Sequence, residues 1–391
     1  MNAIGIICEY NPFHLGHARM LEGLRRQYDA PLVCAMSGNF VQRGDAAVAH
    51  KHARGEMAVR CGADLVLELP TPWAMASAER FADGGVALLA STGVVSHLAF
   101  GSECGDLTAL QAAEAALSRP ELMPRIRQLL AQGMAYAPAR QQAAEKLGAP
   151  PQMLSRPNDI LAIEYLKALR RQRAPMEPLA VQRQGAGHDG APSGDTASAS
   201  YLRTLLRSGR TDEALSYLPA PAAQVLRREL ALGQAPADLS YCQRAILARL
   251  RQLREEDFLP YDGGNEGLYH RFYQAVRTSC SPEELLETAK TKRYPTSRLR
   301  RMLLVAYLEL PEPEHIPYLR LLAASSRGCT LLRQMRGAPV LTKPADVSRL
   351  GQTAQDLFTR EAGWTDLYTL AYPDLSQSAC GADWRATPWI M

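Results

Sequence analysis

Short apolar runs alternate with helix-period segments along the first half of the chain. Each run stops at a glycine, a proline or a polar turn, and the segment after it repeats apolar residues at helical spacing. We expect strands beginning at Ala3 and covering 31–36, 64–69, 97–100 and 179–182, with helices over 48–61 and 78–91. This alternation implies right-handed parallel crossovers. The sequence therefore predicts an α/β protein with a doubly wound parallel sheet.

The pattern changes twice after the fourth predicted strand. Residues from about 107 to 150 have a helical period and are rich in alanine, which predicts a helical insertion. Beyond residue 207, segments rich in leucine, alanine and arginine dominate and the strand alternation is lost. We therefore predict an α/β domain over 1–207 and a mainly α-helical C-terminal domain over 208–391.

Polar loops follow three of the predicted strands, at 37–45, 68–73 and 101–103. The carboxyl ends of parallel strands meet at one edge of a sheet, and doubly wound folds bind their ligands at that edge. Any one of these loops alone fits an ordinary surface connection. Three loops at one edge favour a binding site.

The first predicted strand runs into a turn that holds two histidines and a glycine. His14 and His17 are three residues apart, so on a helical turn both imidazoles face one side, while Gly16 leaves the main chain open to close approach. A helix starting beyond a parallel strand offers unpaired N–H groups and a positive dipole, which favour phosphate. The turn predicts an anion clamp. A metal-binding pair and a purely structural helix cap are the alternatives.

Composition and charge say little about which class of protein this is. The 391 residues are 47% hydrophobic and 21% charged, as in an ordinary globular protein, and the net charge is +4. We expect a cytoplasmic protein, because no run is long enough to cross a bilayer and no signal segment precedes the first strand. The eight cysteines are scattered, so we expect reduced thiols and no zinc site.

A basic cluster stands out in the C-terminal half. Residues 290–301 hold six Lys or Arg residues and no acid, and Tyr294 adds a ring for stacking on a base. Such a mixture is typical of RNA contacts, although a solvated helix start is the plainer interpretation. The candidate RNA-binding residues are Lys290, Lys292, Arg293, Arg298, Arg300 and Arg301.

The quartet His14-Leu15-Gly16-His17 resembles the HxGH signature of the nucleotidyltransferase superfamily. The string from Glu9 to His17 resembles something narrower, the bacterial tRNA(Met) cytidine acetate ligase family. Further motifs of that family stand at 37–44, 101–103, 157–161, Arg183 with 185–187, and 291–294. The resemblance covers nearly the whole chain. It implies a Rossmann-like (HUP) nucleotidyltransferase core as the ATP-binding catalytic domain over 1–207, and a tRNA-binding domain over 208–391.

The resemblance implies an enzyme, an ATP-dependent ligase that forms N4-acetylcytidine at the wobble position of elongator tRNA(Met). Acetate would attack the α-phosphate of ATP and release pyrophosphate. The cytidine amine would then take the acetyl group from acetyl-adenylate and release AMP. Mg²⁺ is expected with ATP, held by phosphate and water without a metal site on the protein. The expected partners are tRNA and acetate, with no membrane and no evident protein partner, and a homodimer stays open.

The resemblance also implies site residues, with His14 and His17 as the catalytic pair. A late helix start of the Ser-x-Thr-x-x-Arg kind binds triphosphate in the superfamily, and this chain has a similar arrangement in Ser198, Ser200 and Arg203, with Ser200 replacing the threonine. The implied ATP-binding residues are Ile7, Cys8, Glu9, Tyr10, Asn11, Pro12, Phe13, His14, Leu15, Gly16, His17, Ala18, Arg19, Met20, Gly101, Asn158, Arg183 and Gln184.

Two other functions compete with this one. A nucleotidyltransferase acting on a small phosphate ester would share the first domain, but a small substrate needs neither a large helical domain nor a basic cluster. A non-catalytic RNA-binding relative would share the fold, but a retired site has no reason to keep His14, Gly16 and His17.

Overall fold

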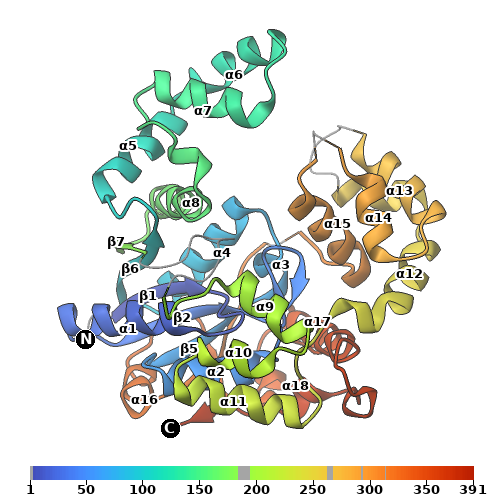
Figure 1. Ribbon diagram of the computed structural model, residues 1–391. Coiled ribbons are helices and arrows are strands. Elements are labelled where there is room, and N and C mark those ends of the chain that lie inside the picture. Colours follow the sequence, from blue (N-terminus) through green and yellow to red (C-terminus); the bar gives the residue numbers. More distant parts are fainter. Residues whose placement is uncertain (1–2, 184–193, 262–266, 292–293, 313) are drawn as a thin grey trace.

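The structure is a computed structural model of the chain, and it describes every residue except 1–2, 184–193, 262–266, 292–293 and 313. An eight-stranded sheet lies at its centre, in the order β10-β8-β5-β2-β1-β6-β7 with β9 beside β8 (Figure 1). Its strands are β1 (Ala3–Cys8), β2 (Leu32–Ser37), β5 (Leu65–Leu69), β6 (Val95–Ser102), β7 (Glu177–Gln182), β8 (Leu319–Ala324), β9 (Val340–Leu341) and β10 (Trp389–Ile390). A separate hairpin consists of β3 (Phe40–Val41) and β4 (Asp45–Ala46).

Five neighbouring strands, β5-β2-β1-β6-β7, run parallel to one another. β1, β2 and β5 are buried at every position, as expected for strands with helices on both faces. α4 (Ala78–Ser91) and α8 (Pro157–Gln172) pack on one face, while α1 (Leu15–Tyr28), α2 (Lys51–Arg60) and α11 (Ala220–Ala231) pack on the other. The predicted α/β fold with a doubly wound parallel sheet is confirmed.

Three helices form an insertion between β6 and α8. The chain leaves the carboxyl end of β6, forms α5 (Leu107–Leu117), α6 (Leu122–Ala131) and α7 (Tyr136–Lys146), and returns at the start of α8. Figure 1 shows α6 and α7 standing away from the sheet. Their buried alanines and leucines extend the apolar core that lies under α4 and α8.

The rest of the chain is mainly helical and forms a third apolar core around α12 to α15. The remaining α-helices are α3 (Thr71–Ala74), α9 (Ala199–Arg207), α10 (Thr211–Ser216), α12 (Gln243–Gln252), α13 (Leu268–Thr278), α14 (Pro282–Ala289), α15 (Thr296–Leu308), α16 (Ser326–Leu332), α17 (Gln352–Thr369) and α18 (Ala382–Arg385). Short 3-10 turns cover Met153–Ser155, Leu239–Cys242, Glu255–Tyr261, Pro344–Arg349 and Leu375–Gln377.

The expectation that strands end before residue 208 is wrong. β8 is a fully buried strand that pairs antiparallel with β5, and β9 and β10 pair parallel with β8. The apolar run Leu319–Ala324 fits a strand buried on both faces, but it is short and isolated among helical segments. The central sheet therefore draws on both sides of residue 207, and the domain boundary there stays a prediction.

Across the described ranges, the chain forms no helix that is both long enough and apolar enough to cross a membrane.

Candidate functional site

A cleft opens where the chain order across the sheet reverses. From β1 the chain crosses to β2 and β5 on one side, and later to β6 and β7 on the other, so the crevice beyond β1 is the switch point at which such sheets bind ligands. The cleft encloses about 1160 Å³ of space, part of it open solvent. Its walls come from β1 and the turn after it, α1, the loop after β2, α4, β6, α8, the end of β7 and α9.

His14 and His17 form a stacked pair at the start of α1. The main-chain N–H of Gly16 donates to Nδ1 of His14 at 3.1 Å, and the N–H of His14 donates to Nδ1 of His17 at 3.2 Å. The two rings stack with centroids 3.7 Å apart. Both residues line the cleft. The capping contacts use only Nδ1 of each ring, so Nε2 remains available to a ligand. The two histidines can therefore cap the helix and bind a ligand at the same time.

The electrostatic surroundings keep both imidazoles neutral. Burial, and to a lesser degree the charge of Arg183, lowers the pKa of His14 to about 3. Burial and the neighbouring His14 lower the pKa of His17 well below its ordinary value. Because Nδ1 accepts a hydrogen bond in each ring, the single ring proton lies on Nε2. Each histidine thus carries one N–H donor whose protonation state does not change near neutral pH.

Gly16 lies beside the imidazole of His14. A side chain at Gly16 would place its Cβ 3.0 Å from Cε1 of His14, so glycine makes room for the capping imidazole. The residue does not line the cleft. The expectation that a ligand approaches the main chain at Gly16 therefore lacks support from its position.

The start of α9 brings hydroxyls and a cation to the same cleft. Ser198 caps the helix by accepting from the N–H of Tyr201 at 3.2 Å. Arg203, which is half-buried, donates to the carbonyl of Asn11 at 2.9 Å and to Oγ of Ser200 at 3.1 Å. No carboxylate among the described residues lies within ion-pair distance of its guanidinium, and burial lowers its pKa. The cation therefore has room for an anionic ligand.

Asn11 supplies a second polar group without a complete set of partners. Its Oδ1 accepts from the N–H of Val48 at 2.8 Å, but no partner among the described residues accepts from its buried Nδ2. A buried donor without an acceptor costs about 1–3 kcal/mol. A polar ligand in the cleft would relieve that cost.

The opposite wall is built from the ends of β6 and β7 and the start of α8. Arg183 follows β7, and its N–H donates to the carbonyl of Ser102 at 2.9 Å. A Cβ at Gly101 would lie 3.2 Å from Cγ of Arg183, so this glycine lets the arginine side chain cross β6. Both residues line the cleft, and Arg183 likewise has no carboxylate within ion-pair distance in the described ranges. Partial burial lowers its pKa.

Asn158 has a side chain that suits an N-cap, but it lies inside α8. Arg156 is the N-cap of α8 and Pro157 is its first residue, a position that suits proline because it needs no N–H. The carboxylate of Glu103 takes over the capping: its Oε1 accepts from Nδ2 of Asn158 at 2.6 Å and its Oε2 from the N–H of Asp159 at 2.8 Å. Asn158 still lines the cleft.

A fully buried arginine fixes the loops that follow β1 and β2. Arg54 donates to main-chain carbonyls of Glu9 (2.5 Å), Ala49 (2.9 Å) and Ser37 (3.1 Å), and also to that of Gly38. These contacts set the geometry of the loop over 37–46, which carries the cleft-lining residues Gln42 and Arg43.

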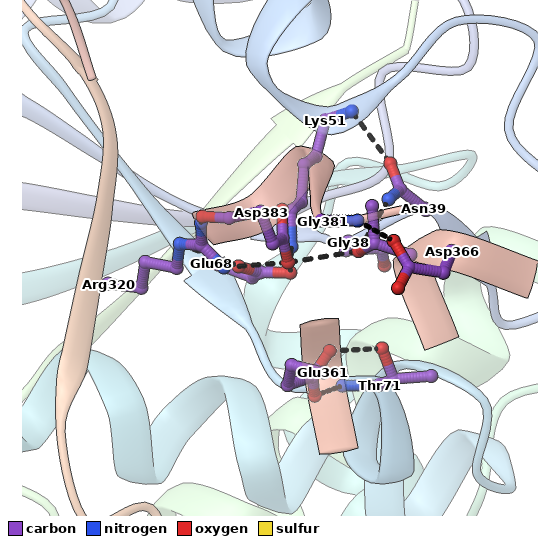
Figure 2. Close-up of polar contacts among 12 residues, drawn as sticks. Gly38, Asn39, Lys51, Glu68, Thr71, Arg320, Glu361, Asp366, Gly381 and Asp383 are labelled. Carbon is purple, nitrogen blue, oxygen red and sulfur yellow. Dashed lines mark hydrogen bonds and ion pairs between the residues drawn. The ribbon is translucent and has the colours of Figure 1, made fainter. Parts of the chain in front are cut away.

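A buried charge network holds the same loop from the other side (Figure 2). Lys51 binds Glu68 at 2.8 Å and Asp383 at 2.6 Å, and Arg320 binds Asp383 at 2.8 Å. The main-chain N–H of Lys51 also donates to Oδ1 of Asn39, at 2.9 Å. The loop at 68–73 therefore contributes Glu68 to a buried ion-pair network and no residue to the lining of the cleft. The other two polar loops reach the cleft.

The predicted ATP-binding residues divide into three groups. The cleft is lined by Ile7, Cys8, Glu9, Tyr10, Asn11, His14, His17, Met20, Gly101, Asn158 and Arg183, and by the candidate phosphate residues Ser198, Ser200 and Arg203. Outside its lining lie Pro12, Phe13, Leu15, Gly16, Ala18 and Arg19. Phe13 is fully buried in the core and Arg19 pairs with Asp195. Gln184 lies outside the described residues.

Sequence reasoning missed the apolar walls of the cleft. Phe81, Phe100, Leu161 and Tyr165 line it. Each of them is an apolar residue at a helix or strand position that also fits the hydrophobic core. No sequence signal therefore separates a residue that lines the cleft from one that packs in the core. Gln42 lies in a loop that the sequence did single out.

The basic cluster lies on and just before α15. Lys290 is exposed and 3.4 Å from Glu287, Arg300 is exposed, and Arg301 is half-buried. Lys292 and Arg293 lie outside the described residues. Tyr294 is buried in the third core with Arg298 above its ring, so the expectation that it stacks on a base is wrong. The sequence could not reveal this because a tyrosine in a basic run has the same appearance in either role.

No group of three or more His, Cys, Asp or Glu side chains is arranged to hold a metal ion in the part of the chain that the structure describes. The metal-pair alternative for His14 and His17 therefore finds no third ligand of these types. Their Nδ1 atoms are also occupied by main-chain N–H groups.

The fold and this cleft define a nucleotidyltransferase: the chain matches the HIGH Nucleotidyl Transferase family model over residues 1–383. It is 34% identical to the tRNA(Met) cytidine acetate ligase of Fervidobacterium nodosum over 98% of each chain. It is 40% identical to that of Syntrophotalea carbinolica over 88% of this chain and 85% of the relative. The chain belongs to the tRNA(Met) cytidine acetate ligase family. Its fold matches crystal structures of Thermotoga maritima TmcAL, apo and with α-thio ATP, at 29% identity over the full length of each chain, with TM-scores of 0.92 and 0.91.

Proposed function

We propose that this protein is an ATP-dependent acetate ligase that forms N4-acetylcytidine at the wobble position of elongator tRNA(Met). Family membership supports this assignment, and the chemistry of the cleft agrees with it. The observation that carries most weight is the convergence on one cleft of two neutral histidine donors and two arginines that have no acid partner among the described residues. Such a donor set matches a polyanion such as the triphosphate of ATP.

The adenylation step needs donors around the α-phosphate and the departing pyrophosphate. Nε2–H of His14 and of His17 can donate to phosphate oxygens as negative charge develops on them. Arg203 and the start of α9 supply further positive potential, and Arg183 does so from the opposite wall. The apolar side chains of Phe81, Phe100 and Leu161 give a nucleotide base a surface to pack on.

Acetate itself is the nucleophile in this reaction, so no serine or cysteine nucleophile is needed. Its carboxylate oxygen bonds to the α-phosphorus and pyrophosphate leaves with the electrons of the broken P–O bond. Glu9 is the single acid among the described residues that line the cleft. We infer that Mg²⁺ enters with ATP and is held mainly by phosphate oxygens and water. When bound, it neutralises charge on the phosphates.

The second step transfers the acetyl group to the exocyclic amine of cytidine and releases AMP. We assign RNA binding to the basic cluster on and before α15, including Lys290, Arg298, Arg300 and Arg301, and to Lys292 and Arg293. A nucleotidyltransferase for a small phosphate ester would need no such surface beside its cleft, so the ligase is the better interpretation.

The test is isotope exchange between pyrophosphate and ATP on the purified protein, with and without acetate and in the absence of RNA. We expect exchange that requires acetate. Mass analysis of nucleosides from treated tRNA then identifies N4-acetylcytidine. If exchange is absent, the assay is repeated with bulk tRNA, which shows whether tRNA must bind first. Continued absence of exchange would favour the small-substrate nucleotidyltransferase.

A further inference from the structure

The start of α15 packs directly on the loop that forms one rim of the cleft. Gly44 in this loop has φ of +75°, and a Cβ there would lie 2.5 Å from the main-chain N of Arg301 and 2.6 Å from the carbonyl carbon of Arg300. The glycine is thus needed both for its backbone conformation and for the close approach of the two segments. The basic cluster and the cleft share a boundary at this contact.

Arg301 differs from its neighbours in the basic cluster. Arg298 lies over the ring of Tyr294, Lys290 lies near Glu287, and Arg300 is exposed. Arg301 is half-buried at the junction, and its one hydrogen bond in the described structure is from Nη1 to the carbonyl of Gln42, at 3.5 Å.

No carboxylate among the described residues lies within ion-pair distance of Arg301. The nearby acid of the loop, Asp45, is bound by Arg207 at 3.0 Å. Burial, followed by the charge of Arg298, lowers the pKa of Arg301, as expected for a cation that lacks a compensating anion. A half-buried guanidinium whose other N–H groups have no partner in the described ranges suits a phosphate, which it can bind through two parallel hydrogen bonds.

The residue bound by Arg301 connects this cation with the cleft. Gln42, whose carbonyl accepts from Arg301, lines the cleft together with Arg43. The N–H of Gln42 donates to Oε1 of Glu9 at 3.0 Å, which ties the rim to the end of β1. A polynucleotide that places one base in the cleft and continues over this rim therefore reaches Arg301 next.

We propose that Arg301 binds a backbone phosphate of the tRNA adjacent to the cytidine that enters the cleft, and so positions that cytidine for acetyl transfer. This inference rests on the proposed function. Arg301 acts as a positioning residue, because it holds the strand and does not touch the reacting atoms. The same guanidinium chemistry also fits a phosphate of ATP, and the test separates the two sources.

The test compares the full-length protein with Arg301→Ala, Arg301→Lys and, as a control on the same helix, Arg300→Ala. Three quantities are measured: the Kd for tRNA over a salt series, the single-turnover rate of acetyl transfer at saturating tRNA, and acetate-dependent pyrophosphate exchange without RNA. We expect Arg301→Ala to raise the Kd about tenfold and to lower the salt slope by about 0.7–1. Transfer at saturating tRNA falls as well, while exchange is unchanged.

The other variants separate charge from geometry. Arg301→Lys keeps the salt slope but loses part of the transfer rate, because lysine cannot bind phosphate through a fork. Arg300→Ala removes an exposed phosphate contact, so it weakens tRNA binding and lowers the salt slope but reduces transfer at saturating tRNA much less than Arg301→Ala does. If Arg301→Ala unfolds at a lower temperature than the unmodified protein, the transfer rate of Arg301→Lys is used to test the proposal in its place.

Three results would overturn the assignment. An unchanged Kd and salt slope would remove Arg301 from the RNA interface. A loss of exchange as large as the loss of transfer would mean that Arg301 binds an ATP phosphate or merely supports the loop. Equal transfer defects in Arg300→Ala and Arg301→Ala would remove the special position of Arg301. If the unmodified protein shows no acetate-dependent exchange either without or with bulk tRNA, the proposed function fails, but the tRNA-binding arm still tests this contact.

Discussion

Two groups of charges lie at the same edge of the sheet and differ in how they are compensated. In the buried network, Lys51 contacts Glu68 and Asp383, and Arg320 contacts Asp383, so each cation has an acid within 2.8 Å. In the cleft, Arg183 and Arg203 have no such partner among the described residues. The first group is complete within the protein, whereas the second needs an anion from outside.

This difference separates a structural use of charged residues from their use in binding a ligand. Removing one member of a compensated group leaves the others buried without a partner, so the folded protein loses stability. Removing a cation that has no acid partner strands no buried acid in the free protein, so the main loss is in ligand binding. The predictions below use this contrast.

The largest effect is expected from Lys51→Met, which leaves Arg320 to compensate both Glu68, at 3.6 Å, and Asp383, at 2.8 Å. We expect it to lower the free energy of unfolding by about 3–5 kcal/mol. Denaturant titration followed by circular dichroism measures this. A change below about 1 kcal/mol would show that the network does not stabilise the fold.

In the cleft, His17→Ala and His14→Asn should lower acetate-dependent pyrophosphate exchange by about 10²–10³-fold, because each removes one donor to the phosphates. Asparagine is a good N-cap, so His14→Asn keeps the cap of α1 and should keep the melting temperature. Binding of tRNA should change little. Full exchange activity in His14→Asn would mean that His14 serves the helix alone, and loss of tRNA binding in His17→Ala would mean that His17 is structural.

Arg203→Met tests the uncompensated cation directly. We expect ATP affinity to fall about 10–100-fold, because a charge-assisted hydrogen bond is lost, while the free energy of unfolding is unchanged or higher. Isothermal titration with ATP and denaturant titration measure the two quantities. Arg207, one turn further along α9, pairs with Asp45 and Asp238, so Arg207→Met is the matched control and should retain ATP affinity. Equal losses in both variants would contradict the assignment.

The smallest expected effect concerns pH. Burial, and then the charge of Glu68, raises the pKa of Glu361 to about 8, although Thr71 donates to its carboxylate. The folded state then holds a proton that the unfolded state releases above its ordinary pKa of 4.5, so this group lowers stability as pH rises from about 4.5 to about 8.

Glu361→Gln removes the titratable group, so its contribution to the pH dependence of stability is lost. The difference in unfolding free energy between the two proteins should change by about 1–2 kcal/mol between about pH 5.5 and pH 7. Denaturant titrations at several pH values measure it. Parallel stability curves for the two proteins would show that Glu361 is already ionised throughout this range.

The sequence revealed local features better than long-range ones. His14, His17, Arg183 and Arg203 lie in short motifs, and the structure brings them to one cleft. Strands β1 and β2 were readable because apolar residues dominate each of them. Contacts between distant segments leave no such pattern: nothing near Lys51 indicates that Asp383 binds it, and nothing near Gly44 indicates that Arg301 packs on it.

The antiparallel pairing of β8 with β5 has a consequence for the order of folding. β5 is complete at residue 69, but its partner begins at residue 319. At about 5–20 residues per second, a nascent chain carries β5 as an open strand edge for roughly 10–50 s. Unpaired apolar edges attract other chains, so slowed translation between these two strands should increase aggregation.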